Sequence, residues 1–207
     1  MKLKVCGLKS RENIIEVVAC KTNFIGFIFY EKSPRYIGEE LEPSFIQRIS
    51  TSKKVGVFVN ESEIKMLDIA SRYGLDYLQL HGNETAEFCK QIQKSIPVIK
   101  AFQIDDDFDF SVLKEYEGTC TYFLFDSKGK QYGGSGETFN WKKLKEYKLQ
   151  KPFFLSGGVD LDNIEQVLLL NSEFPNLYAV DVNSRFETEP GIKDVSKIKL
   201  LSNKIYK

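Results

Sequence analysis

A cysteine and an aspartate stand at the ends of two apolar runs that are far apart in the chain. Cys6 follows residues 3–5, and Asp126 follows residues 122–125. If both runs are strands whose carboxyl ends meet, a thiol and a carboxyl group face one space and can act as base and acid. Each residue also has a common structural role. Most free cysteines pack as small apolar side chains, and an aspartate after a strand often caps a turn or helix.

Two polar, glycine-containing segments near the end of the chain suit a phosphate group. They follow the apolar runs 153–155 and 178–180 and contain Gly157, Gly158, Asp181, Asn183 and Ser184. Paired glycines let backbone N–H groups approach a ligand closely, and a turn that opens a helix presents further N–H groups. Two such loops after consecutive strands are typical of the phosphate site of a (β/α)8 barrel.

Three other features are candidates for substrate contact. Arg35 lies in the loop after the second apolar run, where its guanidinium group can hold a carboxylate or simply be solvated. His81 ends the fourth run and either lines the pocket or bonds to the backbone as a structural histidine; we slightly favour the latter. The glycine-rich residues 133–136 match no nucleotide-binding motif and suit a lid or a plain loop.

The elements that position these residues alternate between strands and helices. Eight short apolar runs are expected to be strands: residues 3–5, 24–29, 55–59, 77–80, 98–102, 122–125, 153–155 and 178–182. Helical spacing of apolar residues is found between them, over residues 13–20, 61–73, 85–94, 163–170 and 192–205. The second of these helices is expected to be capped by Asn60 and to end at Gly74. This alternation predicts parallel strands with right-handed crossovers. We favour one closed (β/α)8 TIM barrel over residues 1–207 rather than an open doubly wound sheet, because polar or glycine residues mark almost every strand end.

Composition limits the classes of partner. The chain has 207 residues with 29 basic and 29 acidic side chains, so its formal net charge is zero. This balance argues against nucleic acid or an anionic membrane as a partner. With one histidine and no paired cysteine motif, a metal site is improbable and the four cysteines are expected to be free thiols. We expect a cytoplasmic monomer or homodimer, with Phe45 and Tyr147 as exposed aromatic candidates for an interface.

Several short motifs together resemble the phosphoribosylanthranilate isomerase family. They occur in the family's order along the whole chain: KVCGL at residues 4–8, SPR at 33–35, LQLHG at 78–82, DS at 126–127, GGSG at 133–136, FNW at 139–141, LSGG at 155–158 and DVNS at 181–184. The resemblance implies a cofactor-free and metal-free Amadori rearrangement of N-(5'-phosphoribosyl)anthranilate in tryptophan biosynthesis. It assigns the general base to Cys6, the general acid to Asp126 and the carboxylate-binding arginine to Arg35. It places the substrate phosphate at Gly157, Gly158, Asn183 and Ser184.

The sequence departs from the family pattern near the phosphate. Asn183 and Arg185 stand where the family often has serine and glycine, and Asn140 stands where aspartate is common. Backbone donation survives the first two changes, and Asn140 is expected to cap a helix. Two alternatives stay open: another phosphosugar isomerase or epimerase, and a barrel that binds phosphosugars without catalysis. The retention of both Cys6 and Asp126 argues against the latter.

Overall fold

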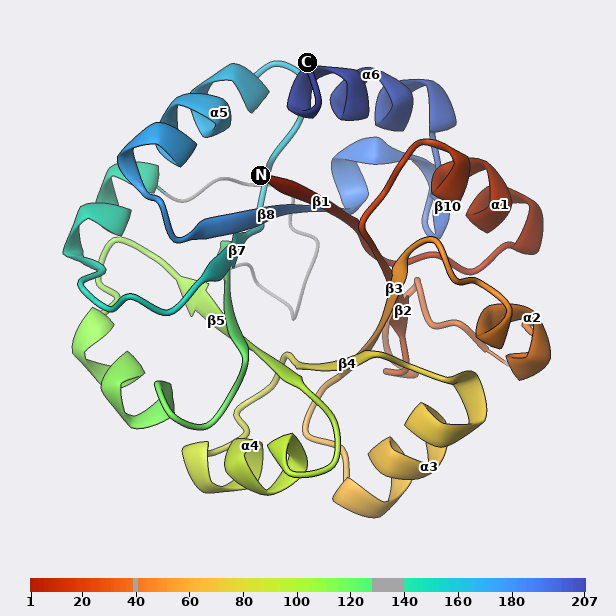
Figure 1. Cartoon of the computed structure of the whole chain (residues 1–207), viewed down its shortest axis with the longest axis horizontal. Helices are drawn as coiled ribbons and strands as arrows, with labels where there is room; N and C mark the ends of the chain where they lie inside the picture. Colours follow the sequence, from red (N-terminus) through yellow and green to blue (C-terminus); the bar gives the residue numbers. More distant parts are fainter. Residues whose placement is uncertain (39–40, 128–139) are drawn as a thin grey trace.

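The computed structural model describes residues 1–38, 41–127 and 140–207, and in it eight parallel strands close into a barrel. Helices surround the barrel, and β1 lies beside β8 where the ring closes (Figure 1). The strands are β1 Lys2–Val5, β2 Phe24–Ile28, β3 Lys53–Phe58, β4 Tyr77–Leu80, β5 Val98–Ile104, β6 Tyr122–Ser127, β7 Phe153–Leu155 and β8 Leu177–Val182. All eight predicted strands are therefore confirmed, as is the closed (β/α)8 barrel.

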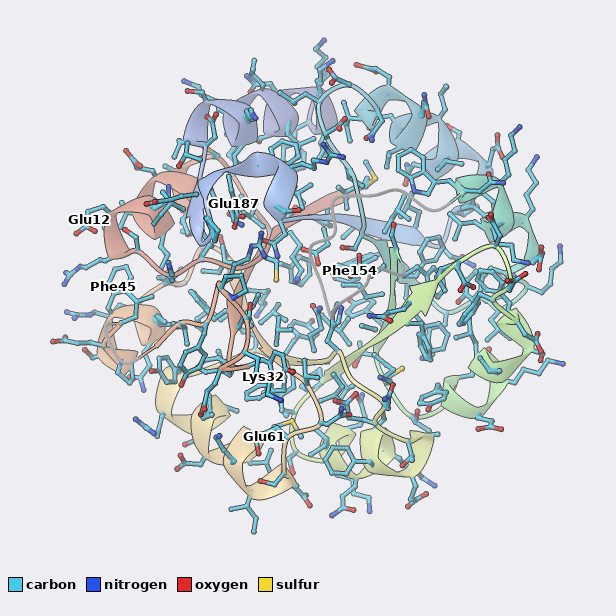
Figure 2. All side chains as sticks on the ribbon, turned by 180° about the vertical axis from the view of Figure 1, so that it is seen from behind. Glu12, Lys32, Phe45, Glu61, Phe154 and Glu187 are labelled. Carbon is cyan, nitrogen blue, oxygen red and sulfur yellow. The ribbon has the colours of Figure 1, made fainter. Side chains whose placement is uncertain are left out.

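The strands form where they were expected because each is buried on both faces, so it needs a nearly continuous apolar run. The side chains inside the barrel make a core of their own, separate from the core between strands and helices. Phe24, Leu124 and Phe154 belong to this inner core, and Phe154 lies near the middle of the ring in Figure 2. This inner core fills the barrel below the strand ends, so a ligand is confined to the mouth.

Helices follow most strands, and several of them begin at a residue whose side chain accepts from a backbone N–H group of the first turn. They are α1 Arg11–Ala19, α2 Pro43–Gln47, α3 Glu63–Tyr73, α4 Ala86–Gln93, α5 Ile164–Glu173 and α6 Val195–Ile205, with 3-10 segments η1 Phe110–Tyr116, η2 Trp141–Glu146 and η3 Ser184–Phe186. The predicted end of α3 at Gly74 is confirmed by its left-handed backbone, φ +60°. The predicted cap role of Asn140 is confirmed too, because its side chain accepts from the Lys142 N–H group.

Three sequence-based expectations are wrong. Ser62, not Asn60, caps α3, since the Ser62 side chain accepts from the Lys65 N–H group. Residues 192–193 belong to a small antiparallel pair, β9 Glu187–Glu189 with β10 Ile192–Lys193, so the last helix starts later than expected. Phe45 and Tyr147 are not exposed: they retain only 9% and 7% of their surface and pack in the outer core.

Other expectations concern the chain as a whole. The four cysteines are free and buried, as predicted. Within the described ranges, no helix has the length and apolar character that crossing a membrane requires. The glycine-rich residues 133–136, a candidate lid, lie outside the described residues, and so does residue 139.

Candidate active site

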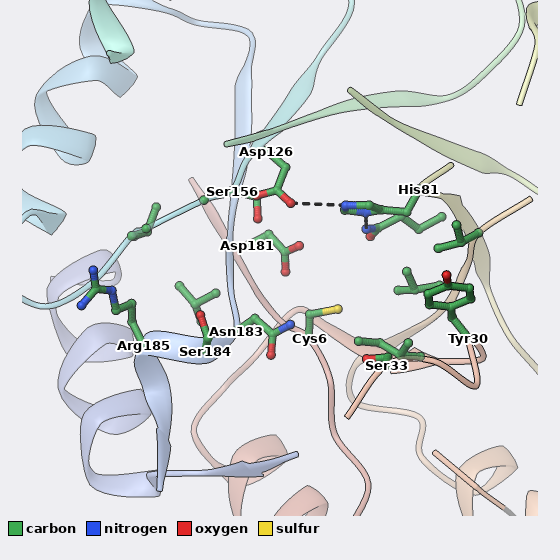
Figure 3. A pocket seen from close by; sticks show the side chains of 18 residues that line it. Cys6, Tyr30, Ser33, His81, Asp126, Ser156, Asp181, Asn183, Ser184 and Arg185 are labelled. Carbon is green, nitrogen blue, oxygen red and sulfur yellow. Dashed lines mark hydrogen bonds and ion pairs between the residues drawn. The ribbon is translucent and has the colours of Figure 1, made fainter. Parts of the chain in front are cut away.

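A pocket opens at the carboxyl ends of the strands. It is lined by every expected site residue except Arg35: Cys6, His81, Asp126, Gly157, Gly158, Asp181, Asn183 and Ser184. Figure 3 shows Asp126 and Cys6 on different sides of this space, with Asp181 between them.

Cys6 directly follows β1 and has 4% of its surface exposed. It lies against Gly26 of β2: a Cβ atom added to Gly26 would come within 2.7 Å of the Cys6 sulfur. The glycine therefore makes the space that the thiol occupies. Burial raises the pKa of the Cys6 thiol, while the Lys4 ammonium group lowers it. The thiolate form of Cys6 thus depends on the cations around it.

Asp126 near the end of β6 is held by one hydrogen bond and lies against His81. Its Oδ1 accepts from the Ser127 N–H group at 3.0 Å, and its Oδ2 lies 3.2 Å from His81 Nε2. The Gln79 amide nitrogen lies 2.7 Å from His81 Nδ1, so Gln79 and Asp126 lie against the two nitrogens of the imidazole ring (Figure 3). His81 bonds to side chains, not to the backbone as we had favoured.

The loops after β7 and β8 lie side by side because these strands are paired in parallel. Gly157 and Gly158 both have left-handed backbone, at φ +82° and +65°. The Asn163 side chain donates to the Gly158 carbonyl group at 2.9 Å and fixes the first loop. Asn183 and Ser184 face the pocket from the second loop, as Figure 3 shows. The arrangement can present backbone N–H groups to a phosphate.

Arg35 lies outside the pocket lining and is held by Glu187 of β9. Its Nε donates to Glu187 Oε1 and Oε2 at 2.9 and 3.0 Å, and its Nη2 donates to Oε2 at 2.8 Å. Glu187 also accepts from Lys193 Nζ at 2.6 Å, and the same Nζ donates to Asn183 Oδ1 at 2.6 Å. Burial lowers the pKa of Lys193 to about 8, against the pull of Glu187. This network connects Arg35 to the loop that carries Asn183.

No group of three histidine, cysteine, aspartate or glutamate side chains within the described ranges could hold a metal ion. The chemistry that the described residues offer is acid–base chemistry beside a polar cradle for an anion.

Comparison with known proteins decides which acid–base reaction this is. The sequence profile of the N-(5'-phosphoribosyl)anthranilate isomerase family matches residues 3–204. The chain belongs to this family. The N-(5'-phosphoribosyl)anthranilate isomerase of Parabacteroides distasonis is 47% identical over 203 residues, 96% of this chain and 90% of that relative. That of Phocaeicola vulgatus is 39% identical over 206 residues, 99% of this chain and 98% of that relative.

Solved structures agree with this assignment to the isomerase family. The phosphoribosyl anthranilate isomerase of Thermus thermophilus superposes with a TM-score of 0.88 at 28% identity, covering 99% of this chain and 98% of that one. Another, solved in complex with reduced 1-(o-carboxyphenylamino)-1-deoxyribulose 5-phosphate, gives a TM-score of 0.80 at 31% identity, over 98% and 97% of the two chains. The activity of the present chain is the isomerisation of N-(5'-phosphoribosyl)anthranilate, a step of tryptophan biosynthesis.

Sequence reasoning missed several residues that lie against the predicted site residues. Gln79 precedes His81 by two residues, so strand alternation could have placed both on the inner face. Lys4 precedes Cys6 by the same spacing and was visible as a lysine inside an apolar run. Glu187 had no local signal, because its partner Arg35 lies 152 residues away in the chain.

Proposed function

We propose that Cys6 is the general base and Asp126 the general acid in the isomerisation of N-(5'-phosphoribosyl)anthranilate to 1-(2-carboxyphenylamino)-1-deoxyribulose 5-phosphate. One observation carries this assignment: a thiol from β1 and a carboxyl group from β6 line the same pocket, each with neighbours suited to its role. The substrate lies between them, with its sugar across the pocket.

The first half of the reaction opens the sugar ring. Protonated Asp126 donates its proton to the furanose ring oxygen, and the bond between this oxygen and carbon 1 breaks. The nitrogen lone pair forms a double bond to carbon 1, which gives a cationic imine. Asp126 is left as a carboxylate that accepts from the Ser127 N–H group and faces His81 Nε2, so the charge that develops on the acid meets a backbone donor and an imidazole nitrogen.

The second half moves the double bond. The Cys6 thiolate takes the proton from carbon 2. The electron pair of the broken C–H bond makes the bond between carbons 1 and 2 double, and the second pair of the carbon–nitrogen double bond returns to nitrogen, which becomes neutral. The resulting enolamine tautomerises: carbon 1 gains a proton and the hydroxyl group on carbon 2 loses one. Because burial raises the pKa of Cys6, the cationic imine helps the thiolate to form near its target.

Binding is assigned to the remaining pocket residues. Gly157, Gly158, Asn183 and Ser184 hold the phosphate, mainly through backbone N–H groups, and Asp181 accepts a hydrogen bond from a sugar hydroxyl group. Asp181 suits this role because its Oδ1 is buried and has no hydrogen-bond partner among the described residues.

Arg35 holds the anthranilate carboxylate. Glu187 takes its Nε and one Nη2 donor, which leaves the Nη1 edge of the guanidinium group for the substrate. Glu187 also fixes the direction in which that edge points.

The test is the loss of N-(5'-phosphoribosyl)anthranilate fluorescence, with substrate generated in situ. Wild-type protein is compared with Cys6→Ser and Asp126→Asn. Cys20→Ser serves as a matched control, because Cys20 is a buried cysteine at the C-terminal end of α1 that does not line the pocket. We expect turnover by wild type and Cys20→Ser, and losses of at least about a hundredfold in kcat for the two site variants.

Inorganic phosphate binding is measured in parallel and should survive in all variants. Normal turnover by Cys6→Ser or Asp126→Asn would remove that residue from the acid–base pair. A folded wild-type protein that binds phosphosugar without turnover would instead be a binding barrel.

We further propose that residues 1–207 act as one domain, as a cytoplasmic monomer or homodimer. A related isomerase from Thermotoga maritima is described as dimeric. Light scattering after gel filtration decides between the two states, and a larger assembly would contradict both.

A further inference from the structure

Lys4 is a buried charge that the proposed mechanism leaves without a role. It lies in β1, none of its surface is exposed, and it stands opposite Asp181 in the register of β1 and β8. Its Nζ lies 2.8 Å from Asp181 Oδ2. Burying two charges is expensive, and apolar side chains of similar volume often replace such a pair without loss of stability. We therefore expect the Lys4–Asp181 pair to have a role other than stabilising the closed barrel.

Strand alternation brings Lys4 close to the proposed base. Residues two apart in a strand share a face, so Lys4 and Cys6 both point into the barrel. Among the charged groups that act on Cys6, the Lys4 ammonium group is the largest influence that opposes the effect of burial on the pKa of the thiol. The Asp181 carboxylate of β8 raises the pKa of Cys6, and the Lys193 ammonium group of β10 lowers it.

Asp181 connects this cation to the ligand. Its Oδ2 holds Lys4, while its Oδ1 has no partner among the described residues and the side chain faces the pocket beside Cys6 (Figure 3). Although burial lowers the pKa of Lys4, Asp181 and Cys6 together raise it above its ordinary value. The ammonium group is therefore charged at neutral pH and fixed in direction, with His81 and Asp126 across the pocket as the other titratable groups.

We propose that Lys4 is a positioning residue of the isomerisation: its buried ammonium group, anchored by Asp181, stabilises the thiolate form of Cys6 that accepts the proton from carbon 2. This inference rests on the proposed role of Cys6 as base. The fixed cation favours the thiolate before substrate arrives, and the cationic imine adds a second positive charge during the reaction.

The test measures the thiolate directly. Alkylation of Cys6 by iodoacetamide is followed by mass spectrometry of its peptide between pH 6 and 11, in wild type, Lys4→Met and Asp181→Asn. Removing a neighbouring opposite charge shifts a pKa by about one to three units. Lys4→Met should move the midpoint of alkylation upward by at least one pH unit and slow alkylation at pH 8 tenfold or more. Asp181→Asn should move the midpoint downward, because the ammonium group stays and the competing anion is gone.

The two variants together separate this role from a structural one. If the pair only closes the barrel, both variants loosen the same contact and cannot shift the midpoint in opposite directions. Lys100→Met is the matched control, since it breaks another buried pair, Lys100 Nζ to Glu84 Oε2 at 2.9 Å, on β5. It should leave the Cys6 midpoint unchanged. If Lys4→Met does not fold, Asp181→Asn alone decides: a downward shift supports the proposal, and no shift or an upward one overturns it.

Kinetics give a second readout. The kcat of Lys4→Met should fall at least tenfold at pH 7.5 and recover as the pH is raised, with KM changed less than threefold. A deficit that is constant with pH would overturn the proposal. Failure of the proposed function is distinct from this, because it appears as turnover by Cys6→Ser whatever the alkylation profiles show.

Discussion

Gly157 is the residue at which one added methyl group should disturb both phosphate binding and the acid. Its backbone has φ +82°, and a Cβ atom there would lie 2.1 Å from Ser127 Oγ and 2.5 Å from Ser127 N. The hydroxyl group can rotate away, but the backbone nitrogen cannot. That nitrogen carries the N–H group that holds Asp126 Oδ1, so Gly157→Ala pushes directly on the strand end that positions the acid.

The size of the effect follows from two separable contributions. A left-handed backbone at a residue with a Cβ atom costs about 1 kcal/mol, and forced overpacking costs about 1–3 kcal/mol more. Gly157→Ala should therefore lower the free energy of unfolding by about 2–4 kcal/mol. Gly38 has φ +64° with no described atom within 4 Å of an added Cβ, so Gly38→Ala carries only the backbone contribution of about 1 kcal/mol. Gly118 has neither a left-handed backbone nor a described atom within 4 Å of an added Cβ, so Gly118→Ala should leave the free energy of unfolding unchanged or raise it slightly.

Urea denaturation measures the three stabilities, and steady-state kinetics with inorganic phosphate as competitor measures the site. We expect Gly157→Ala to weaken phosphate inhibition at least tenfold and to lower kcat, while the other two variants keep wild-type kinetics. The reasoning is refuted if Gly157→Ala and Gly38→Ala lower the free energy of unfolding by the same amount, because the contact with Ser127 then contributes nothing to the loss. Wild-type phosphate inhibition in Gly157→Ala would refute the assignment of this loop to the phosphate.

Two further predictions concern the network around Arg35. Glu187→Gln leaves Arg35 and Lys193 without the carboxylate that they share. Urea denaturation should show that the free energy of unfolding falls by about 3–5 kcal/mol, and steady-state kinetics should show a raised KM for the substrate. Glu165→Gln, which breaks an exposed pair with Lys204, should change neither the free energy of unfolding nor KM. Equal effects of the two variants would contradict the role given to Glu187. The lowered pKa of Lys193, about 8 against an ordinary value of 10.5, means that between these values the unfolded chain binds a proton that the folded chain has lost. The stability of wild type relative to Lys193→Met should therefore rise from pH 8 to about 10.5, by up to roughly 1.4 kcal/mol per pH unit, and a flat difference would exclude the shift.

The strand order and the location of the pocket were predictable because they follow from burial. A strand covered on both faces must be apolar, so β4 and β7 could be located at their observed bounds from composition alone. Once the barrel is assumed, the first polar residues after each strand must meet at one end. This is why Cys6 and Asp126 could be brought together although 120 positions separate their numbers.

What could not be predicted depends on contacts between distant loops. Asn60 looked like a helix cap, yet its backbone has φ +50° and its side chain accepts from the Asn83 N–H group, so it joins two loops instead. The partner of Arg35 was equally hidden, because Glu187 belongs to a hairpin whose second strand, residues 192–193, was predicted to be the start of a helix. Apolar spacing does not indicate such pairings, since each joins polar side chains from segments far apart in the chain.

The zero net charge of the chain conceals an unequal distribution around the pocket. On the side of β1 and β8, Cys6 has Lys4 and Lys193 as neighbouring cations, with Arg35 held nearby. On the far side, Asp126 accepts from the Ser127 N–H group and faces His81 Nε2. Cations favour an ionised thiol, and a donor beside a carboxyl group stabilises the negative charge that remains after the group gives up its proton. The two roles are therefore fixed by surroundings as much as by side-chain type. Exchanging the thiol and the carboxyl group between β1 and β6 should not conserve catalysis, even if the barrel tolerates both residues.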